Sequence, residues 1–399
     1  MSSYRIGTER FTGESPELQR ALEACRPSKQ RPLCLCCEPG VPMYIAPIAG
    51  HLIVKRMPNS GGDHAPACDS YEPPAELSGL GQVMGTAIHE DPDAGLTALK
   101  LDFSLTKTAG RSAPVPSGNE TDSVKTDGQK LSLRGALHYL WDEAGFNRWS
   151  PAMQGRRTWA AIRKYLLQAS EGKVTKGASL TDSLYIPESF QAERKADIAE
   201  RRIAQMGKAT PQGSKGARRL MIVIGEIKEI ASAHFGRKVF FKHLPDCPFM
   251  VNQDLYDRLT RRFEIELGLW DALEDIHLVA IGTFGMNAAG MAAIEEISLM
   301  TVTANWIPFE TQYDKQLIDA MTQAQRRFMK GLRYNLSTQL PLACLVASDT
   351  RPTPTAMYIL PPVASQEHHS ALDALIAESK LVHWLWKPAL GQMPALPLA

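Results

Sequence analysis

The sequence lacks the features that would place the chain in a membrane or outside the cell. No run of 18 uninterrupted apolar residues is present, so we expect no membrane span and no membrane partner. The first 20 residues have no apolar core and predict no signal peptide. The seven cysteines are odd in number and accompany no secretion signal. This favours a reducing cytoplasm over a disulfide framework.

Strong charge and nucleotide-binding motifs are also absent. The net charge is +1, so any nucleic-acid footprint has to be local. There is no Walker loop, no Rossmann glycine pattern and no GxSxG elbow, and no internal repeat is apparent. With 399 residues, 44% hydrophobic and 22% charged, the composition is typical of a soluble globular protein of two or three domains.

Mixed helical and strand patterns predict an α+β protein in three parts. We expect a zinc-ribbon-like module with flanking strands over residues 1–105, a helical segment over 131–205 and a mixed α/β body over 218–390. Residues 106–130 are rich in Ser, Thr, Gly and Pro and predict a mobile loop. Residues 191–219 predict a basic connector with few apolar residues, and its last part, residues 206–219, predicts a flexible stretch.

Capping residues and hydrophobic spacing place the individual elements. Helices are predicted from Ser15, from Ser132 and from Ser150 with Pro151. A hairpin that turns at Gly50 is predicted over residues 43–57. The remaining predicted strands cover residues 98–105, 219–230, 238–244, 277–286, 297–309, 329–334, 341–348, 355–361 and 381–387, and the remaining helices cover 254–273, 310–328 and 370–379.

Four soft-metal ligands gather near the N-terminus. Cys34 and Cys36 are two residues apart, so in a strand they face the same side. His64 and Cys68 are four apart, which suits a helical turn or a tight loop, and the hairpin between the pairs returns the chain. This spacing predicts a tetrahedral Cys3His zinc site, and its closed shell predicts a structural rather than a catalytic ion. Cys37 is a reserve ligand, and the alternative is a set of buried thiols with a surface histidine.

The helices predicted after residue 131 resemble a helix-turn-helix and carry several basic residues. These residues are available for phosphate contacts, while tryptophans at helical spacing are more often core residues and a charged helix face is more often simply solvated. The candidate nucleic-acid-binding residues are Arg148, Arg156, Arg157, Arg163 and Lys164.

The N-terminal cysteines, together with LHYLWDEAGFNRW, RLMIVIGEIKEI, WIPFE and RRFMKGLRYN, resemble an uncharacterised bacterial family, domain of unknown function 1173. The resemblance covers nearly the whole chain. It implies no established activity. It implies cargo of integrated or conjugative elements, and therefore DNA-linked work in a bacterial cytoplasm beside other proteins of the same element.

The order helix, three strands, helix, strand over residues 308–388 resembles the core of PD-(D/E)XK nucleases, which is also the restriction-endonuclease-like core. That resemblance implies Mg²⁺ bound by Glu310 and Asp349. The next strand carries Tyr358 and Leu360 where the family has Glu and Lys. A separate Glu-x-Lys pair, Glu226 and Lys228, lies in an earlier strand, where a solvated strand edge is the alternative.

These observations lead to three hypotheses of function. The first is a zinc-stabilised, DNA-associated binding or accessory protein of a bacterial mobile element. The second is a Mg²⁺-dependent nuclease of the PD-(D/E)XK type. The third is a scaffold that binds only protein. We favour a protein that is not an enzyme, because the departures at Tyr358 and Leu360 remove the residues that the nuclease reaction needs.

Overall fold

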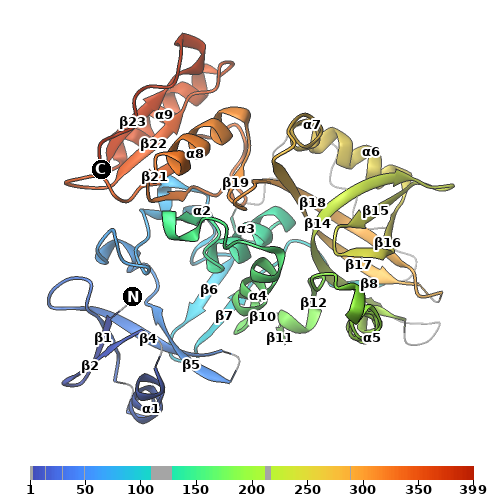
Figure 1. Cartoon of the computed structure of the whole chain (residues 1–399), viewed down its shortest axis with the longest axis horizontal. Coiled ribbons are helices and arrows are strands. Elements are labelled where there is room, and N and C mark those ends of the chain that lie inside the picture. Colours follow the sequence, from blue (N-terminus) through green and yellow to red (C-terminus); the bar gives the residue numbers. More distant parts are fainter. Residues whose placement is uncertain are drawn as a thin grey trace.

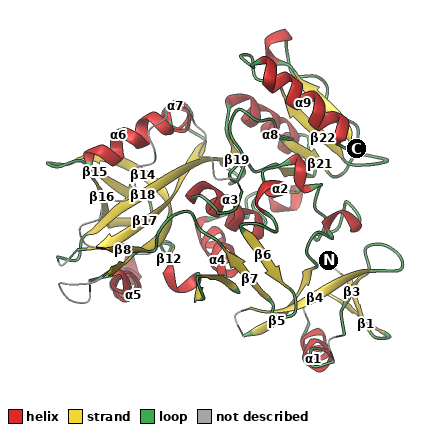
Figure 2. Cartoon of the chain, turned by 180° about the vertical axis from the view of Figure 1, so that it is seen from behind, coloured by secondary structure: helices red, strands yellow, loops and turns green. Residues whose placement is uncertain are grey.

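A computed structural model describes residues 3–13, 15–28, 30–48, 50–108, 128–211, 217–287 and 289–399. The chain is α+β, as predicted, and its strands form several separate sheets. Figure 1 shows the N-terminal sheet at the lower left, helices α3 and α4 in the centre, a barrel-like sheet at the right and the C-terminal sheet at the upper left. The same arrangement is seen from behind in Figure 2.

The N-terminal sheet has the strand order β2-β1-β3-β4-β5. Helix α1 (Pro16–Cys25) begins at the predicted cap, where the Ser15 hydroxyl accepts a hydrogen bond from the Leu18 N–H. The predicted hairpin turns at Gly50, which has a φ of 78°. The core between α1 and the sheet is small. The strands are β1 (Ser3–Ile6), β2 (Glu9–Thr12), β3 (Leu33–Cys34), β4 (Val41–Ile48) and β5 (His51–Arg56), and the buried core residues are Ile6, Leu18, Leu22, Cys25 and Leu52.

A second, four-stranded sheet connects this module to the central helices, in the order β11-β10-β7-β6. The strand predicted over residues 98–105 ends at Leu99. Residues 109–127 of the predicted mobile loop lie outside the described residues. The elements are α2 (Leu80–Val83), β6 (Ile88–Asp91), β7 (Leu96–Leu99), α3 (Leu133–Glu143), α4 (Trp159–Ser170), β10 (Lys173–Thr175) and β11 (Ala178–Ser179).

The prediction of a helix from Ser150 is wrong. Residues Pro151–Met153 form only a short 3-10 turn. Helix α4 starts at Trp159, because the Thr158 hydroxyl accepts a hydrogen bond from the Ala161 N–H and caps it there. The connection from α3 to α4 is therefore far longer than the three or four residues of a helix-turn-helix, and that interpretation is also wrong.

The third sheet closes on itself as a barrel. Strand β14 pairs with both β15 and β17, and β15–β16, β16–β18 and β17–β18 complete the ring. Only the β16–β18 pair of this ring is parallel. Strands β12 and β19 add to its edges. The elements are β12 (Leu184–Tyr185), β14 (Met221–Ser232), β15 (Arg237–Phe241), β16 (Leu244–Val251), β17 (Ile276–Met286), β18 (Ala292–Thr303) and β19 (Pro308–Phe309).

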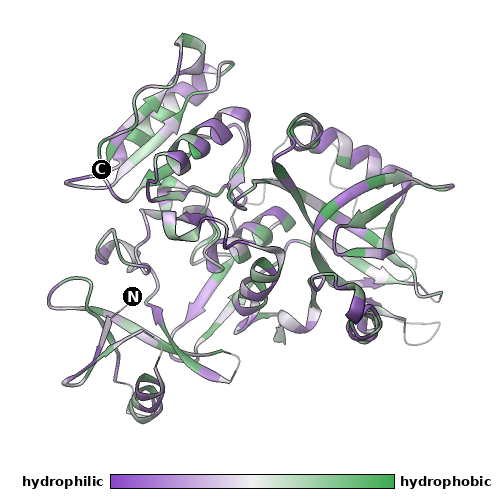
Figure 3. Ribbon diagram, in the orientation of Figure 1, coloured by the Kyte–Doolittle hydropathy of each residue, from purple (hydrophilic) through white to green (hydrophobic). Residues whose placement is uncertain are grey.

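Alternate residues of the barrel strands face two different cores. Inward residues such as Phe249 and Phe284 form the barrel interior, which α6 (Gln253–Arg262) and α7 (Glu264–Ala272) help to close. Outward residues such as Ile224 and Ile281 pack against α3 and α4. Figure 3 shows hydrophobic colour along these strands. Burial on both faces explains why β14 and β17 read as nearly continuous apolar runs.

The basic connector predicted over residues 191–219 is partly helical. It contains helix α5 (Lys195–Met206), which buries Ile198 and Met206. Arg202 of this helix lies 2.8 Å from an Asp246 carboxylate oxygen on the barrel. The segment ends in β13 (Ala217–Arg219), which pairs with β8 (Thr106–Thr108). Helix formation here depends on burial against the barrel, which the basic composition did not reveal.

The C-terminal sheet has the order β23-β22-β21-β20-β9. Strands β20, β21 and β22 are antiparallel, and β23 returns parallel to β22 after α9. The predicted order of helix, three strands, helix and strand is therefore present. The elements are β9 (Arg148–Trp149), α8 (Gln312–Gln323), β20 (Phe328–Lys330), β21 (Leu345–Ala347), β22 (Thr355–Ile359), α9 (Gln366–Glu378) and β23 (Val382–Trp386).

The three parts predicted from the sequence share strands in the structure. Segment 131–205 contributes β9 to the C-terminal sheet, β10 and β11 to the four-stranded sheet, and β12 to the barrel. Residues 218–390 hold two sheets, the barrel and the C-terminal sheet, rather than one body. Among the described residues, no helix combines the length and apolar character that a membrane crossing requires.

Candidate metal centre

The four predicted metal ligands meet at one point. The ligand atoms of Cys34, Cys36, His64 and Cys68 all lie within 4.8 Å of one another. Sγ of Cys34 is 3.7 Å from Sγ of Cys68. His64 Nδ1 is 3.3 Å from Sγ of Cys36 and 3.7 Å from Sγ of Cys68. Around a tetrahedral zinc, two sulfurs are about 3.8 Å apart and a sulfur and a nitrogen about 3.5 Å apart. The cluster could therefore hold a metal ion.

A strand and a closed loop position these ligands. Cys34 ends β3, which is held between β1 and β4 and pairs with Tyr4 and Val41. His64 and Cys68 lie in a loop that closes where the Glu72 N–H donates to the Gly61 carbonyl at 3.1 Å. A Cβ at position 61 would lie 2.5 Å from the Glu72 Cβ, so this closure requires glycine. The turn after strand β3 and this loop bring the two ligand pairs together.

Burial favours the neutral thiol at each cysteine of the cluster, but at Cys36 the Ala65 N–H and the neighbouring thiols outweigh burial and lower the pKa. Burial raises the pKa of Cys34 to about 12, and the nearby Cys68 thiol acts in the same direction. Burial also raises the pKa of Cys68 and lowers that of His64. The Ala65 and Ser70 N–H groups donate to the sulfurs of Cys36 and Cys68, each at 3.4 Å. A metal ion would replace the thiol protons and offset the repulsion between thiolates.

Cys37, the reserve ligand of the sequence, lies outside the four-ligand set. It is exposed, and its sulfur donates to the Asp63 carbonyl at 3.4 Å and lies 3.9 Å from the sulfur of Cys36. Its position at the rim makes it a thiol of the same loop that takes no part in the cluster. It is therefore a matched control for the ligand cysteines.

A groove adjoins the metal cluster. It is open to solvent and lies between the metal loop and the edge of the C-terminal sheet, and Cys34, Cys36 and Cys68 are part of its lining. Arg148 and Arg327 line it from the sheet side. The Arg148 guanidinium also donates to the Asp69 carbonyl at 2.6 Å, and it lies 3.5 Å from Glu72. Arg148 therefore ties the metal loop to the C-terminal sheet.

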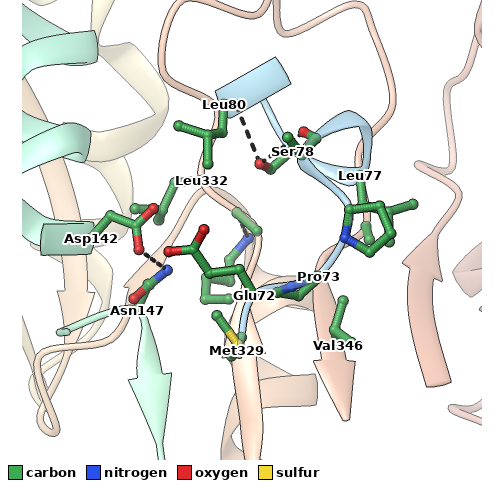
Figure 4. A pocket seen from close by; sticks show the side chains of 15 residues that line it. Glu72, Pro73, Leu77, Ser78, Leu80, Asp142, Asn147, Met329, Leu332 and Val346 are labelled. Carbon is green, nitrogen blue, oxygen red and sulfur yellow. Dashed lines mark hydrogen bonds between the residues drawn. The ribbon is translucent and has the colours of Figure 1, made fainter. Parts of the chain in front are cut away.

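A smaller cavity lies behind the metal loop, where it meets α3 and β20. Figure 4 shows the carboxylate of Glu72 pointing toward Asp142 and Asn147, with Leu80, Leu332 and Met329 around them. Burial raises the pKa of Glu72 to about 7, although Arg56 is only 2.7 Å away and acts in the opposite direction. This carboxylate therefore titrates near neutral pH beside the metal loop.

The predicted nucleic-acid-binding residues do not form one surface. Arg157 lies before α4 and donates to the carbonyls of Phe146 and Asn305 at 3.0 and 3.1 Å, so it is a structural residue. Arg163 donates to the Ile186 carbonyl at 3.0 Å. Arg148 is engaged with the metal loop as described above. Arg156 and Lys164 are exposed. The tryptophans of this region, Trp141, Trp149 and Trp159, are buried core residues.

Glu226 lies in the barrel strand β14, Glu310 follows β19 and Asp349 lies in the turn after β21, and each of these carboxylates has a basic partner. Glu226 in β14 accepts from His277 Nδ1 at 2.6 Å and lies 2.5 Å from Lys242. Glu310 lies 2.7 Å from Arg333, and Asp349 lies 2.7 Å from Arg326. Lys228 is exposed while Glu226 is buried, because the strand register shifts between Ile227 and Glu229.

Each of these carboxylates is therefore engaged in an ion pair, and the structure does not bring them together in one cluster as it does the metal ligands. Within the described ranges, the Cys3His cluster is the only group of three or more metal-binding side chains. Tyr358, which replaces a metal-binding residue of the nuclease pattern, is fully buried. Sequence reasoning missed the salt bridges because the partners lie far away in the chain. It also missed the exposed aromatic in the β14–β15 turn, although the turn residues ASAHFG between two strands were a signal.

Comparison with known protein families assigns the chain to one of them. The family described as protein of unknown function, DUF1173, matches residues 4–389. The chain belongs to this family. The resemblance seen in the sequence is thereby confirmed, and the family brings no activity with it. Among the curated proteins compared, none matches. No solved structure matches either, so this comparison does not support a nuclease-like fold for the C-terminal sheet.

Proposed function

We propose that this DUF1173 protein is a zinc-stabilised, DNA-associated binding protein of the bacterial cytoplasm, an accessory of a mobile element rather than an enzyme. The zinc proposal is supported by the donor set. Three sulfurs and one imidazole suit zinc, and four protein ligands leave no position for a reacting water. The ion would hold the zinc-ribbon-like hairpin against the loop that ends at Glu72.

The proposed DNA association is based on the barrel formed by strands β14 to β18. Its strands follow the order β14-β15-β16-β18-β17 and then return to β14, with a helical segment between β16 and β17. A five-stranded Greek-key barrel is the architecture of the OB-fold, which binds oligonucleotides and oligosaccharides through strands two and three and the adjoining loops. The likeness concerns strand order alone, and DNA binding would depend on the side chains at the surface of the barrel.

A salt series tests DNA association. The metal-loaded protein is titrated into fluorescent DNA at 50 to 300 mM salt and its anisotropy is followed. Phosphate contacts predict that log K falls linearly with log salt, with a slope of about −0.7 per contact for single strands. Metal content is measured in parallel, and about one zinc per chain is expected. The absence of binding even at the lowest salt would refute the DNA proposal without touching the zinc proposal.

Two alternatives remain distinct from this proposal. The element order of the C-terminal sheet favours a nuclease-like fold, but its carboxylates are neutralised. The groove between the metal loop and the C-terminal sheet favours a protein partner. A protein-only scaffold predicts no DNA binding at low salt, and a nuclease predicts cleavage with Mg²⁺ or Mn²⁺.

A further inference from the structure

The outer surface of the barrel has a covered side and a free side. On the covered side, Ile222 and Ile224 of β14 and Val279 and Ile281 of β17 are part of the core formed with α3 and α4. The outward residues of β15 and β16 belong to no core cluster. Figures 1 and 2 both show these two strands at the outer margin of the molecule. This free side is open to a ligand.

One row of side chains crosses the free side from strand to strand. Ala231 of β14 is paired with Lys238 of β15, Lys238 with Met250 of β16, and Met250 with Ala293 of β18. Phe240, two residues after Lys238, lies on the same side of its strand. Val239 and Phe241, between and beyond them, are fully buried inside the barrel. The row therefore offers two small, one cationic and one apolar side chain, with an aromatic ring beside it.

Two hairpin turns flank the row on opposite sides. Phe235 occupies the β14–β15 turn and is 82% exposed, with its ring 4.3 Å from the His234 ring in an edge-on contact. Gly236 fixes this turn, because its φ is 84° and a Cβ there would lie 2.2 Å from the Val251 carbonyl oxygen. On the other flank, Met291 begins the approach to β18 and is 51% exposed.

The charges on this side are more basic than acidic. Lys228 and Lys238 are in no ion pair in the described part of the chain, and one acidic residue, Glu229, lies opposite Phe240 in the register of β14 and β15. Arg237 lies over the Tyr256 ring at 4.4 Å, next to the Phe235 turn. A neutral oligosaccharide would leave the excess of ammonium groups uncompensated. Cationic groups next to one exposed and one half-buried aromatic ring, Phe235 and Phe240, suit the backbone and the bases of an unpaired strand.

We propose that the free side of the barrel binds single-stranded nucleic acid. Phe235 and Phe240 contact the faces of unpaired bases, and Lys228 and Lys238 contact the phosphates. Recognition is tolerant of sequence, because every base has a face to stack and the row offers no paired donor and acceptor to read base edges. A duplex hides its base faces, so it forms only the phosphate contacts. The inference rests on the proposed DNA association and names its surface and its ligand class.

The experiment compares four forms of the metal-loaded protein: wild type, Phe235→Ala, Lys238→Ala and the control Val363→Ala. Val363 is 95% exposed on a loop of the C-terminal part, so its removal tests for a general effect of losing an exposed apolar side chain. Anisotropy is measured with a 20-nucleotide oligo(dT), the matching duplex and a neutral oligosaccharide. Because Phe235 is exposed, its truncation leaves the fold intact, which melting curves verify.

Wild type is expected to bind oligo(dT) at least tenfold more tightly than the duplex. Phe235→Ala is expected to weaken oligo(dT) binding about tenfold, as the loss of one stacked base requires. Lys238→Ala is expected to reduce the salt slope by about 0.7. Binding of oligo(dT) that neither variant changes would refute this surface and leave DNA association standing. Equal affinity for the duplex, or tighter binding of the oligosaccharide, would refute the ligand class. No DNA binding at all would refute both proposals.

Discussion

The metal cluster and the carboxylates of the nuclease hypothesis both consist of side chains that can bind metals, yet the fold places them in different surroundings. At the cluster, three thiols and an imidazole from two segments of the chain meet at one point. Glu310 and Asp349, in contrast, each lie 2.7 Å from an arginine of their own. Glu226 has both a lysine and a histidine. Four converging soft ligands suit a metal ion, whereas a carboxylate paired with a basic side chain is typical of a structural ion pair.

The two regions also differ in how their cores are built. The N-terminal sheet buries only a few apolar residues against α1, whereas the barrel interior contains closely packed aromatic rings such as Phe241, Phe249 and Phe284. Ring centroids there are 5.1 to 5.2 Å apart. Because the core of the N-terminal sheet is small, a metal ion at the Cys3His cluster would add to its stability. The barrel needs no such ion.

Loss of the metal is expected to produce the largest difference between the N-terminal sheet, which it destabilises, and the barrel, which it leaves intact. In zinc-finger peptides, structural zinc contributes about 10 to 16 kcal/mol of apparent binding free energy at pH 7. Cys34→Ser is therefore expected to lose the ion, and hydrogen exchange is expected to accelerate in residues 33–72 while β14, β17 and β18 stay protected. Zinc is measured by elemental analysis. Cys37→Ser, a neighbouring thiol outside the cluster, is expected to keep full zinc. If Cys34→Ser keeps full zinc, Cys34 is not a ligand and the proposed metal cluster is wrong.

Breaking one compensated carboxylate is expected to have a smaller but clear effect. Arg333 also donates to the carbonyls of Ser337 and Leu340, and its side chain is 10% exposed. Arg333→Met leaves the Glu310 carboxylate without its cation and is expected to cost about 3 to 5 kcal/mol in denaturant unfolding. As a control, Arg20→Ala removes an exposed pair with Glu17 and is expected to cost at most about 1 kcal/mol. An equal cost for the two variants would contradict a structural role for Glu310.

The smallest expected effect is on DNA cleavage. Supercoiled plasmid and linear DNA are incubated with the protein and Mg²⁺ or Mn²⁺ and resolved on a gel. Because the Asp349 and Glu226 carboxylates are neutralised in place, we expect no cleavage by wild type, Asp349→Ala or Glu226→Ala. Cleavage by wild type that either substitution abolishes would overturn the assignment of these carboxylates to structure.

Local signals in the sequence predicted the elements well where capping and hydrophobic spacing were strong. Ser15 and Ser132 start their helices as expected, and Gly50 turns the hairpin. The helix predicted from Ser150 failed because the chain first makes a 3-10 turn, and Thr158 offers a second cap eight residues later. Local rules do not choose between two caps, because burial of Trp159 against distant residues decides between them.

The candidate sites divide in the same way. The ligand pairs Cys34/Cys36 and His64/Cys68 were visible because each pair is close in sequence and the types are those that zinc prefers. The barrel side was not visible, because its row joins residues from four strands that hydrogen-bond across long separations. The misjudged roles of Arg157 and Glu226 have the same origin, since their partners are far away in the chain.

The sequence by itself determined the family, the α+β class and which side chains are suited to hold a metal. Those properties follow from residue type and short-range spacing, which the chain carries into any fold. Only the tertiary structure decided that the sheet of β14 to β18 closes into a barrel, which of its sides stays open and which charged residues neutralise one another. Strand pairing and burial bring together residues that are more than a hundred positions apart, and short-range spacing contains no information about them.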